Sequence, residues 1–298
     1  MKKIVTFILL IGLVMSFTAC TDTENTPPEI TTQNLYDSSN VPALLEKYDS
    51  VLVQRTANGE VYREDYYSKE YRYAFFDGEL YGEESDSKLL STDHSYFYYI
   101  DNTYMQDVIL TPDGMVDMKK LFAEDLEKEF FSADILNDII TSVTEKDGHI
   151  FVTNVSDQEE IDDAKAQGWI LGEDEYVLDA KTREVISVKG VSVSESGEEY
   201  EGAVYITYNA DIPEGMKKLV EYAQQTEDMR TVTVVSNPGT ANEKTESIQV
   251  PKGLPVAFSA DLDVEKTFTL YADAACTQTF EEEPDVNSDS TVYIKWNE

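Results

Sequence analysis

Short runs in which apolar and polar residues alternate dominate the first two thirds of the chain. This alternation predicts half-buried β-strands, because successive side chains of a strand point to opposite faces. The Asn58-Gly59 pair between the first two runs is typical of a tight hairpin. The predicted strands cover residues 51–56, 60–67, 71–76, 95–101, 105–110, 149–155, 175–179, 184–194 and 200–209.

Apolar residues at helical spacing interrupt this series of strands. The first predicted helix follows Ser39 or Asn40, either of which can cap it. A longer segment is predicted to be helical in two pieces that break near Ser132, and an acidic helix is closed by Gly168. The predicted helices cover residues 41–48, 117–143, 157–167 and 213–225.

The sequence pattern changes after Asp228. Short β-type runs follow, separated by turns rich in proline, glycine and asparagine. These runs cover residues 231–235, 247–250, 267–271 and 291–296. A length of 298 residues suggests one large or two modest domains. We therefore expect a domain boundary near Asp228 and a small all-β module over residues 229–298.

The first twenty residues have the pattern of an export signal. Met1-Lys2-Lys3 gives a positive start, and a charge-free apolar run follows from Ile4 to Phe17. The run is shorter than the roughly 20 residues that span a bilayer, but it suits a signal-peptide core. The segment Ser16-Phe17-Thr18-Ala19-Cys20 resembles the bacterial lipobox. An ordinary secretory signal is the alternative, although its cleavage favours a small residue at the position of Phe17.

This resemblance implies a diacylglyceryl thioether on the sulfur of Cys20 and cleavage before that residue. The signal peptide would then cover residues 1–19. The polar stretch over residues 20–34, which contains two prolines and lacks apolar periodicity, is expected to be a flexible tether. Two acyl chains anchor a protein stably where one does not. We therefore expect a membrane-anchored, extracytoplasmic protein.

The chain is strongly acidic, with a formal net charge of −36 at pH 7. A nucleic-acid partner is disfavoured, because contacts to phosphates depend on lysine and arginine. Anionic lipid headgroups would repel the body of the protein for the same reason. The acidity is explained either by solubility or by attraction of divalent cations and cationic partners.

Two further resemblances concern the exported part. The ending Ser290-Thr-Val-Tyr-Ile-Lys-Trp296 resembles the closing strand of the Listeria–Bacteroides type surface repeat, which implies a surface module and suggests a Gram-positive host. The order of elements over residues 35–209, with the hairpin over 176–186, resembles the LolA/LppX-like lipoprotein fold. That resemblance implies an α+β fold, with a curved antiparallel sheet, helices on one face and an apolar concave side that holds acyl chains. The sheet domain would cover residues 35–228.

Tyrosine is unusually frequent between Tyr62 and Tyr104. In the predicted strand over residues 95–101, Tyr96, Tyr98 and Ile100 share one face. Tyrosines are amphipathic and suit the rim of a ligand groove, so these three residues are the candidate groove. The alternative is that they are core residues and cross-strand pairs.

No motif for catalysis or for a cofactor is present in the sequence. His94 and His149 stand alone, without metal-type spacing or a nucleophile motif, and acidic pairs arise by chance among 59 acidic residues. Cys276 is the single cysteine of the expected mature chain besides the lipidated Cys20, so no internal disulfide is predicted. We expect no enzyme activity, no cofactor and no metal site.

Among metal sites, a calcium loop is the one that the acidic C-terminal segment resembles most. Asp285, Asn287 and Asp289 have the alternate spacing that begins an EF-hand loop. Ser290 stands where that loop requires glycine, and Trp296 where it requires glutamate. We therefore interpret the segment as a polar turn before the last strand.

The sequence leads to a non-enzymatic envelope lipoprotein that holds a hydrophobic or lipid ligand in a cavity between sheet and helices. Its partners would be the membrane, through the lipid on Cys20, and a hydrophobic ligand or an envelope protein. Two alternatives stay open. The chain could be a surface interaction or spacer protein without a small ligand, or a hydrolase whose site assembles only in space.

Overall fold

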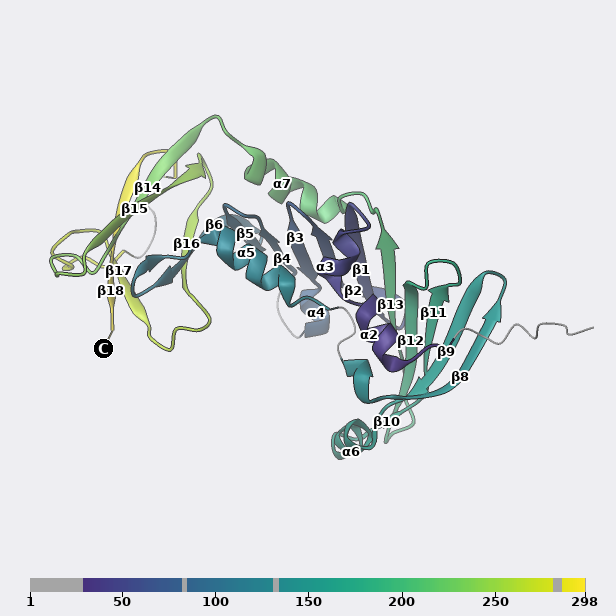
Figure 1. The fold of residues 1–298 in the computed structure, drawn as a ribbon. Coiled ribbons are helices and arrows are strands. Elements are labelled where there is room, and N and C mark those ends of the chain that lie inside the picture. Colours follow the sequence, from purple (N-terminus) through teal and green to yellow (C-terminus); the bar gives the residue numbers. More distant parts are fainter. Residues whose placement is uncertain (1–28, 82–84, 131–133, 281–285, 298) are drawn as a thin grey trace, which may run out of the picture.

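The computed structural model describes residues 29–81, 85–130, 134–280 and 286–297. Two sheets make up the fold, one of 14 strands and one of four (Figure 1). The large sheet has the order β16-β6-β5-β4-β3-β2-β1-β13-β12-β11-β9-β8, with β7 pairing with β6 and β10 with β12. The small sheet has the order β15-β14-β18-β17. The predicted α+β class with a large curved antiparallel sheet and a small β module is confirmed.

The strands of the large sheet are β1 (Ser50–Ala57), β2 (Glu60–Ser68), β3 (Arg72–Phe76), β4 (Ser87–Ser91), β5 (Tyr96–Ile100), β6 (Thr103–Thr111), β7 (Gly114–Met115), β8 (Ile139–Lys146), β9 (His149–Val155), β10 (Trp169–Leu171), β11 (Asp174–Asp179), β12 (Val185–Ser194), β13 (Glu199–Tyr208) and β16 (Val256–Ala260). The small sheet contains β14 (Met229–Ser236), β15 (Lys244–Pro251), β17 (Phe268–Tyr271) and β18 (Ser290–Trp296). The helices are α2 (Thr32–Ser38), α3 (Val41–Leu45), α4 (Gly78–Tyr81), α5 (Met118–Glu127), α6 (Gln158–Ala166) and α7 (Lys217–Gln224), with 3₁₀ turns η1 (Asp134–Asn137) and η2 (Glu214–Met216). None of the helices in the described part of the chain combines the length and the apolar character needed to cross a bilayer.

The predicted hairpin between β1 and β2 is confirmed. Asn58 and Gly59 have φ values of 50° and 86°, so both residues of the turn are left-handed. Two such residues make the turn whose twist matches that of the flanking strands. The pairing then runs from Ala57 opposite Glu60 to Ser50 opposite Ser68.

The large sheet packs helices against both of its faces, and not against one face as predicted from the sequence. On one face, Leu35 of α2 and Val41, Leu44 and Leu45 of α3 join buried side chains of β1, β9, β11 and β12 in one core. On the other face, Leu219 and Val220 of α7 pack against residues of β2 to β5 in a second core. Figure 1 shows α5 beside α3, in front of β4 to β6, and α7 along the upper edge.

The prediction of helix over residues 117–143 is wrong in its second half. The structure has α5 up to Glu127, the turn η1, and then the strand β8 from Ile139 to Lys146. Asp147 and Gly148, with φ values of 53° and 79°, close a hairpin that pairs β8 with β9. Partly buried Ile140 and Val143 pack on the first core from this strand. The β-branched residues that suggested a helical repeat therefore serve an edge strand.

The first described residues lie within the predicted tether. Thr31 caps α2, accepting a hydrogen bond from the Asn34 amide, and Ile30 is buried in the first core. Residues 30–34, predicted to be part of the flexible tether, are therefore packed against the fold. The predicted signal peptide, Cys20 and the tether before residue 29 lie outside the described residues.

The C-terminal segment contributes one strand to the large sheet. β16 pairs in parallel with β6, with Ala257 opposite Asp107 and Ser259 opposite Ile109. The small sheet begins at Met229, just beyond the predicted boundary at Asp228. The division into two folding units stays a prediction.

Candidate functional site: two cavities on one face of the large sheet

The face of the large sheet that α2 and α3 cover also carries two cavities. Residues directly opposite each other in neighbouring strands lie on the same face. Such pairs connect Val51 of β1 to Tyr96 of β5 through Tyr67, Arg72 and Ser91. In the other direction Arg55 opposes Val204, which in turn opposes Val188. One cavity lies around Val188 and Val204, the other around Tyr96.

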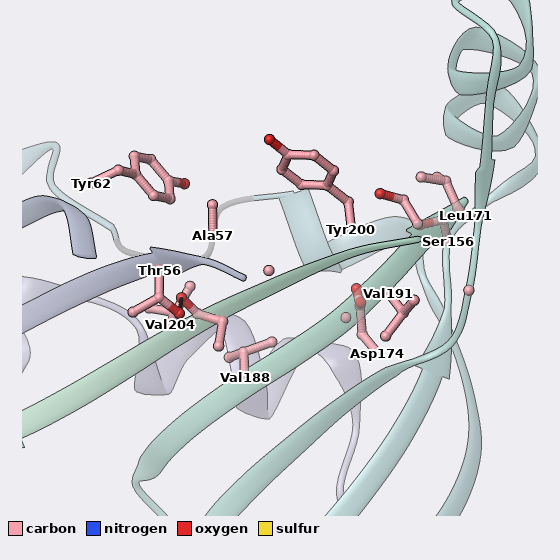
Figure 2. Close-up of a pocket in the computed structure, with 15 residues that line it drawn as sticks. Thr56, Ala57, Tyr62, Ser156, Leu171, Asp174, Val188, Val191, Tyr200 and Val204 are labelled. Carbon is pink, nitrogen blue, oxygen red and sulfur yellow. Dashed lines mark hydrogen bonds between the residues drawn. The ribbon is translucent and has the colours of Figure 1, made fainter. Parts of the chain in front are cut away.

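The first cavity, here called the end cavity, has a volume of about 530 Å³. It lies at the end of β1 nearest the Asn58-Gly59 hairpin, beyond the part of the face that α2 and α3 fill. In Figure 2 the rings of Tyr62 and Tyr200 lie in the upper part of the view, and Val188 and Val204 lie lower, beside the strands. Its lining residues are Thr56, Ala57, Tyr62, Ser156, Leu171, Gly172, Asp174, Val188, Gly190, Val191, Ser192, Tyr200, Gly202, Ala203 and Val204.

Three glycines in the walls make room for this cavity. A Cβ on Gly202 would meet no heavy atom within 4 Å, so this position opens directly into space. A Cβ on Gly190 would lie 2.0 Å from Asp174 Oδ1, and one on Gly172 would lie 2.5 Å from the carbonyl oxygen of Val191. Glycine inside a strand often marks a place where a ligand or another chain segment approaches closely. Here Gly190 lets the Asp174 carboxyl lie flat against β12.

Asp174 is the one acidic or basic side chain in the walls of the end cavity. Burial, followed by the negative charge of Glu160, raises its pKa to about 6. Burial also raises the pKa of nearby Asp138 to about 6, with Glu160 and Asp174 adding to the effect and a hydrogen bond from Asn154 opposing it. No hydrogen bond or ion pair to the Asp174 carboxylate is found among the described residues. The acid faces an otherwise uncharged space.

Apolar side chains surround the mouth of the end cavity. Leu171, Val191 and Tyr200 line the cavity, and all three side chains are exposed. The Trp169 ring meets the Tyr200 ring edge-on, with centroids 5.9 Å apart. Three large exposed apolar residues at one cavity are the kind of surface that marks an interaction or ligand site.

The second cavity, here called the tyrosine cavity, has a volume of about 400 Å³ and lies between the large sheet, α5 and the segment after β16. It is lined by Tyr96, Tyr98, Asp107, Ile109, Leu121, Asp125, Lys128, Ser259, Ala260, Asp261, Leu262 and Asp263. Tyr96, Tyr98 and Ile100 were predicted from the sequence to line one groove. The structure brings Tyr96 and Tyr98 together in this lining, while Ile100, which is 39% exposed, lies outside it. That these residues bind a ligand stays a prediction.

The two tyrosines form a corner in the wall of the tyrosine cavity. Their ring centroids are 5.0 Å apart and their planes meet at 68°. Burial raises the pKa of both phenols, so both rings stay protonated at neutral pH. Neutral electron-rich rings at a corner can hold an apolar chain or a cation.

Asp107 lies opposite Tyr96 and is 4% exposed. Within the described part of the chain, neither of its carboxylate oxygens has a partner in hydrogen-bonding geometry. Burial raises the pKa of this carboxyl, while the nearby Ser259 hydroxyl and Val108 amide lower it to a smaller extent. A buried carboxylate without a donor is costly, so this group needs an explanation.

A cluster of ion pairs lies on the same face near Tyr67. Asp65, which is buried, pairs with Arg55 and with Arg63, whose Nε lies 2.8 Å from Asp65 Oδ2. Arg72 pairs with Glu129 and with Asp125, whose Oδ2 lies 3.3 Å from Nη1. These contacts tie the segment from Asp125 to Glu129 to the strands next to the tyrosine cavity.

The other sequence candidates do not join these cavities. His94 is largely exposed, pairs with its neighbour Asp93 at 2.9 Å, and lines a smaller cavity of about 250 Å³ that also reaches Asp107. His149 lies beside Phe151 with ring centroids 6.4 Å apart. Cys276 is a free, partly buried thiol.

The described acids, histidines and cysteine do not form a metal site. Within the described ranges, no group of three His, Cys, Asp or Glu residues is arranged to hold a metal ion. Of the calcium-type segment, Asn287 and Asp289 are described and Asp285 lies outside the described residues. Asp289 accepts a hydrogen bond from the Thr231 amide at 2.7 Å, which joins the segment to β14.

Two functional candidates were missed in the sequence, and both are single acids inside strands. Asp107 follows Gln106 in an otherwise apolar stretch, and a charged residue there suggests a solvent-facing position. Residues 259–263, which line the cavity beside it, are distant in the sequence. The glycines at positions 190 and 202 were the available signal for the end cavity, because glycine inside strands is unusual.

Comparisons with known proteins complete the description. The chain matches no protein-family model and no curated protein. Among solved structures it is similar to lipoprotein LppX from Mycobacterium tuberculosis, with 7% identity, a TM-score of 0.33, and coverage of 62% of this chain and 99% of that one. It is also similar to LprF from Mycobacterium bovis, with 10% identity, a TM-score of 0.30, and coverage of 61% and 94%. A putative outer membrane lipoprotein-sorting protein domain from Vibrio parahaemolyticus has 8% identity, a TM-score of 0.21, and coverage of 64% and 100%. Likenesses at these TM-scores carry no functional assignment for this chain.

Proposed function

We propose that this chain is a membrane-anchored extracytoplasmic lipoprotein that holds a hydrophobic ligand, such as an acyl or alkyl chain, in the end cavity. The observation that supports the proposal is an open cavity of about 530 Å³ walled by valines, glycines and tyrosines. Its size falls within the range of ordinary small-molecule pockets, which is roughly 300–1,000 Å³. The proposed role is binding, without catalysis.

The walls favour an apolar chain over a polar ligand. Val188, Val191, Val204 and Leu171 offer apolar surface, and each methylene that leaves water on binding contributes about 0.8 kcal/mol. The exposed apolar side chains at the mouth extend this surface outward. A chain of several methylenes would therefore gain enough free energy to bind at micromolar concentration.

The negative charge of the end cavity limits which polar head group a ligand can carry. Asp174 contributes the one formal charge of the walls, and the whole chain carries −36. An anionic head group placed beside Asp174 would be repelled, and repulsion in a partly buried site is weakly screened. We therefore favour ligands whose polar end is uncharged.

The test is to fill the end cavity from Gly202. A leucine there would project into open space without meeting the backbone, so the fold should tolerate it. With the full chain, we expect Gly202→Leu to weaken binding of a fluorescent alkyl probe, such as an anthroyloxy-labelled long-chain alcohol, by at least tenfold. Thr207→Leu, at an exposed position of the same strand outside the cavity, is the matched control and should bind like the parent.

Two results would count against ligand binding. One is equal binding of the probe by the parent and by Gly202→Leu. The other is the absence of any hydrophobic molecule in mass spectra of organic extracts of the parent purified from its host. Either would favour the alternative of a surface interaction protein without a small ligand.

Anchoring is tested separately at Cys20, so that the two parts of the proposal can fail independently. Cys20→Ser removes the sulfur that would carry the lipid. We expect this variant to leave the membrane fraction completely and to lose the mass of the diacylglyceryl group. Retention of Cys20→Ser in the membrane without detergent would contradict the lipid anchor and leave the cavity argument unaffected.

A further inference from the structure

The tyrosine cavity contains a buried acid, Asp107, to which no lysine or arginine of the described chain is paired. Asp107 is 4% exposed, and both of its carboxylate oxygens are buried without a hydrogen-bond partner in the described ranges. Lys128 lines the same cavity, but no ion pair within 4.0 Å joins it to Asp107. Another buried acid of this face, Asp65, is paired with two arginines. The fold can therefore neutralise a buried carboxylate, and here it leaves one open to a cavity.

The side chains around Asp107 are those that recognise an organic cation. Tyr96 and Tyr98 present a corner of two rings with centroids 5.0 Å apart. A cation over such rings is attracted to their electron-rich faces, and the attraction is stronger where the site excludes water. The carboxylate adds a hydrogen-bond acceptor at the wall, where N–H donors would satisfy oxygens that now have none.

The mouth of the tyrosine cavity is acidic as well. Asp125, Asp261 and Asp263 line it, and of these Asp125 is paired with Arg72. The main chain of Asp261 is held in place, because its amide donates to the Leu110 carbonyl at 2.9 Å. Lys128 supplies the one positive charge in the lining. Cations are thus attracted to the mouth, while carboxylates and phosphates are repelled.

We propose that the tyrosine cavity binds a small alkyl amine through its protonated ammonium group. In this arrangement the ammonium donates hydrogen bonds to Asp107 and lies against the rings of Tyr96 and Tyr98. The alkyl part contacts Ile109 and Leu121, and a second ammonium, in a diamine, is placed among the acids at the mouth. The site is separate from the end cavity, so it does not depend on the function proposed there.

The test compares molecules of one length that differ in charge, using isothermal titration of the full chain at low salt. The probes are 1,5-diaminopentane, n-pentylammonium, n-pentanol and pentanoate. We expect the diamine to bind most tightly, the monoamine about tenfold more tightly than the alcohol, and pentanoate not at all. Equal binding of the amine and the alcohol would overturn the proposal, and so would the absence of amine binding up to 10 mM.

Variants then assign the binding to this cavity. Asp107→Asn keeps the shape and removes the charge, and we expect it to weaken amine binding at least tenfold. Tyr98→Leu removes a ring and should cost about fivefold, whereas Tyr98→Phe keeps the ring and should stay within twofold. Asp113→Asn, which removes an exposed charge outside the cavity, is the control for the net charge of the chain. Parent-like binding by both Asp107→Asn and Tyr98→Leu would refute the site, and the probe series on the parent remains decisive even if one variant fails to fold.

One further probe distinguishes a free alkyl amine from a lysine side chain of a peptide as the ligand. The methylamide of Nα-acetyl-lysine carries a primary ammonium on an alkyl chain that is attached to a peptide. Tighter binding of 1,5-diaminopentane than of this lysine derivative supports a free amine as the ligand. Binding of the lysine derivative alone would overturn the assignment to free amines.

Discussion

The two cavities lie on one face of one sheet, yet they differ in what makes them. Three glycines of the strands and connecting segments open the end cavity, and its walls carry a single formal charge, on Asp174. The tyrosine cavity is closed from above by α5 and by the segment after β16, which contribute Asp125, Lys128, Asp261 and Asp263. Strand alternation decides which side chains face inward. The elements packed on top then decide whether the space is apolar or charged.

The filled part of the face explains why there are two cavities and not one groove. Leu35, Leu44 and Leu45 are almost completely buried against β1 and its neighbours. Each such leucine contributes about 2 kcal/mol by leaving water. A ligand would have to displace these helices to occupy the middle of the face. Binding is therefore confined to the two ends.

The largest effect is expected at Asp65, whose ion pairs belong to the charged part of this face. Asp65→Asn removes a buried carboxylate and leaves Arg55 and Arg63 without their partner. Breaking a buried pair from one side costs about 3 kcal/mol, because the remaining charges stay desolvated. Urea denaturation should show this loss, while Asp113→Asn, at an exposed position, should change stability by less than about 0.5 kcal/mol. A loss below 1 kcal/mol for Asp65→Asn would mean that the pairs add little to the fold.

The next effect separates two of the glycines that open the end cavity. Gly190→Ala places a Cβ 2.0 Å from Asp174 Oδ1 and forces the carboxyl to move, whereas Gly202→Ala meets nothing within 4 Å. Alanine in a strand is otherwise better than glycine by roughly 0.5–1 kcal/mol. We therefore expect Gly202→Ala to be slightly more stable than the parent and Gly190→Ala to be about 1–2 kcal/mol less stable than Gly202→Ala. Equal melting temperatures of the two variants would contradict the close approach of Asp174 to β12.

Much of the strand pattern of the fold could be predicted from the sequence, because each strand has its own alternation and its own turn. Residues 51–76 show this well, with the Asn58-Gly59 turn between two alternating runs. The segment 139–146 was misjudged, since Ile139, Ile140 and Val143 fit both a helical and an extended spacing. Val256–Ala260 was missed because its partner is β6, far away in the sequence, and no residue of it is fully buried.

The candidate site was predictable only in part, for a physical reason. Tyr96 and Tyr98 stood out because two large aromatic residues on one strand face need a cover or a cavity. Asp107 and Asp174 did not stand out, because the pKa and the burial of an acid depend on what packs over it. For Asp107 that is α5 and residues 259–263, and for Asp174 it is the approach of Glu160 from α6. No local pattern encodes these contacts.

The smallest of the three effects is the pH dependence that Asp174 gives to the end cavity. The ordinary pKa of this carboxyl is 3.8 and the folded pKa is about 6, so the folded state holds the proton more tightly than the unfolded state. This contributes stability that is fully present below about pH 4 and is lost as the pH rises to about 6. Asp174→Asn removes the charge, so its melting temperature should rise relative to the parent between pH 4 and pH 8. After allowance for partial exposure of the carboxyl, the gain at pH 8 should be about 1 kcal/mol.

Glu160→Gln provides the control for this last effect, because it removes the charge that adds to the burial of Asp174. It should shift the difference between parent and Asp174→Asn toward lower pH and make it smaller. The tyrosine cavity contains none of these groups, so amine binding by Asp174→Asn should equal that of the parent at pH 8. A pH-independent difference between parent and Asp174→Asn would mean that Asp174 titrates as an exposed acid. The end cavity would then be wetter than its apolar walls indicate, and its preference for a hydrophobic ligand would weaken accordingly.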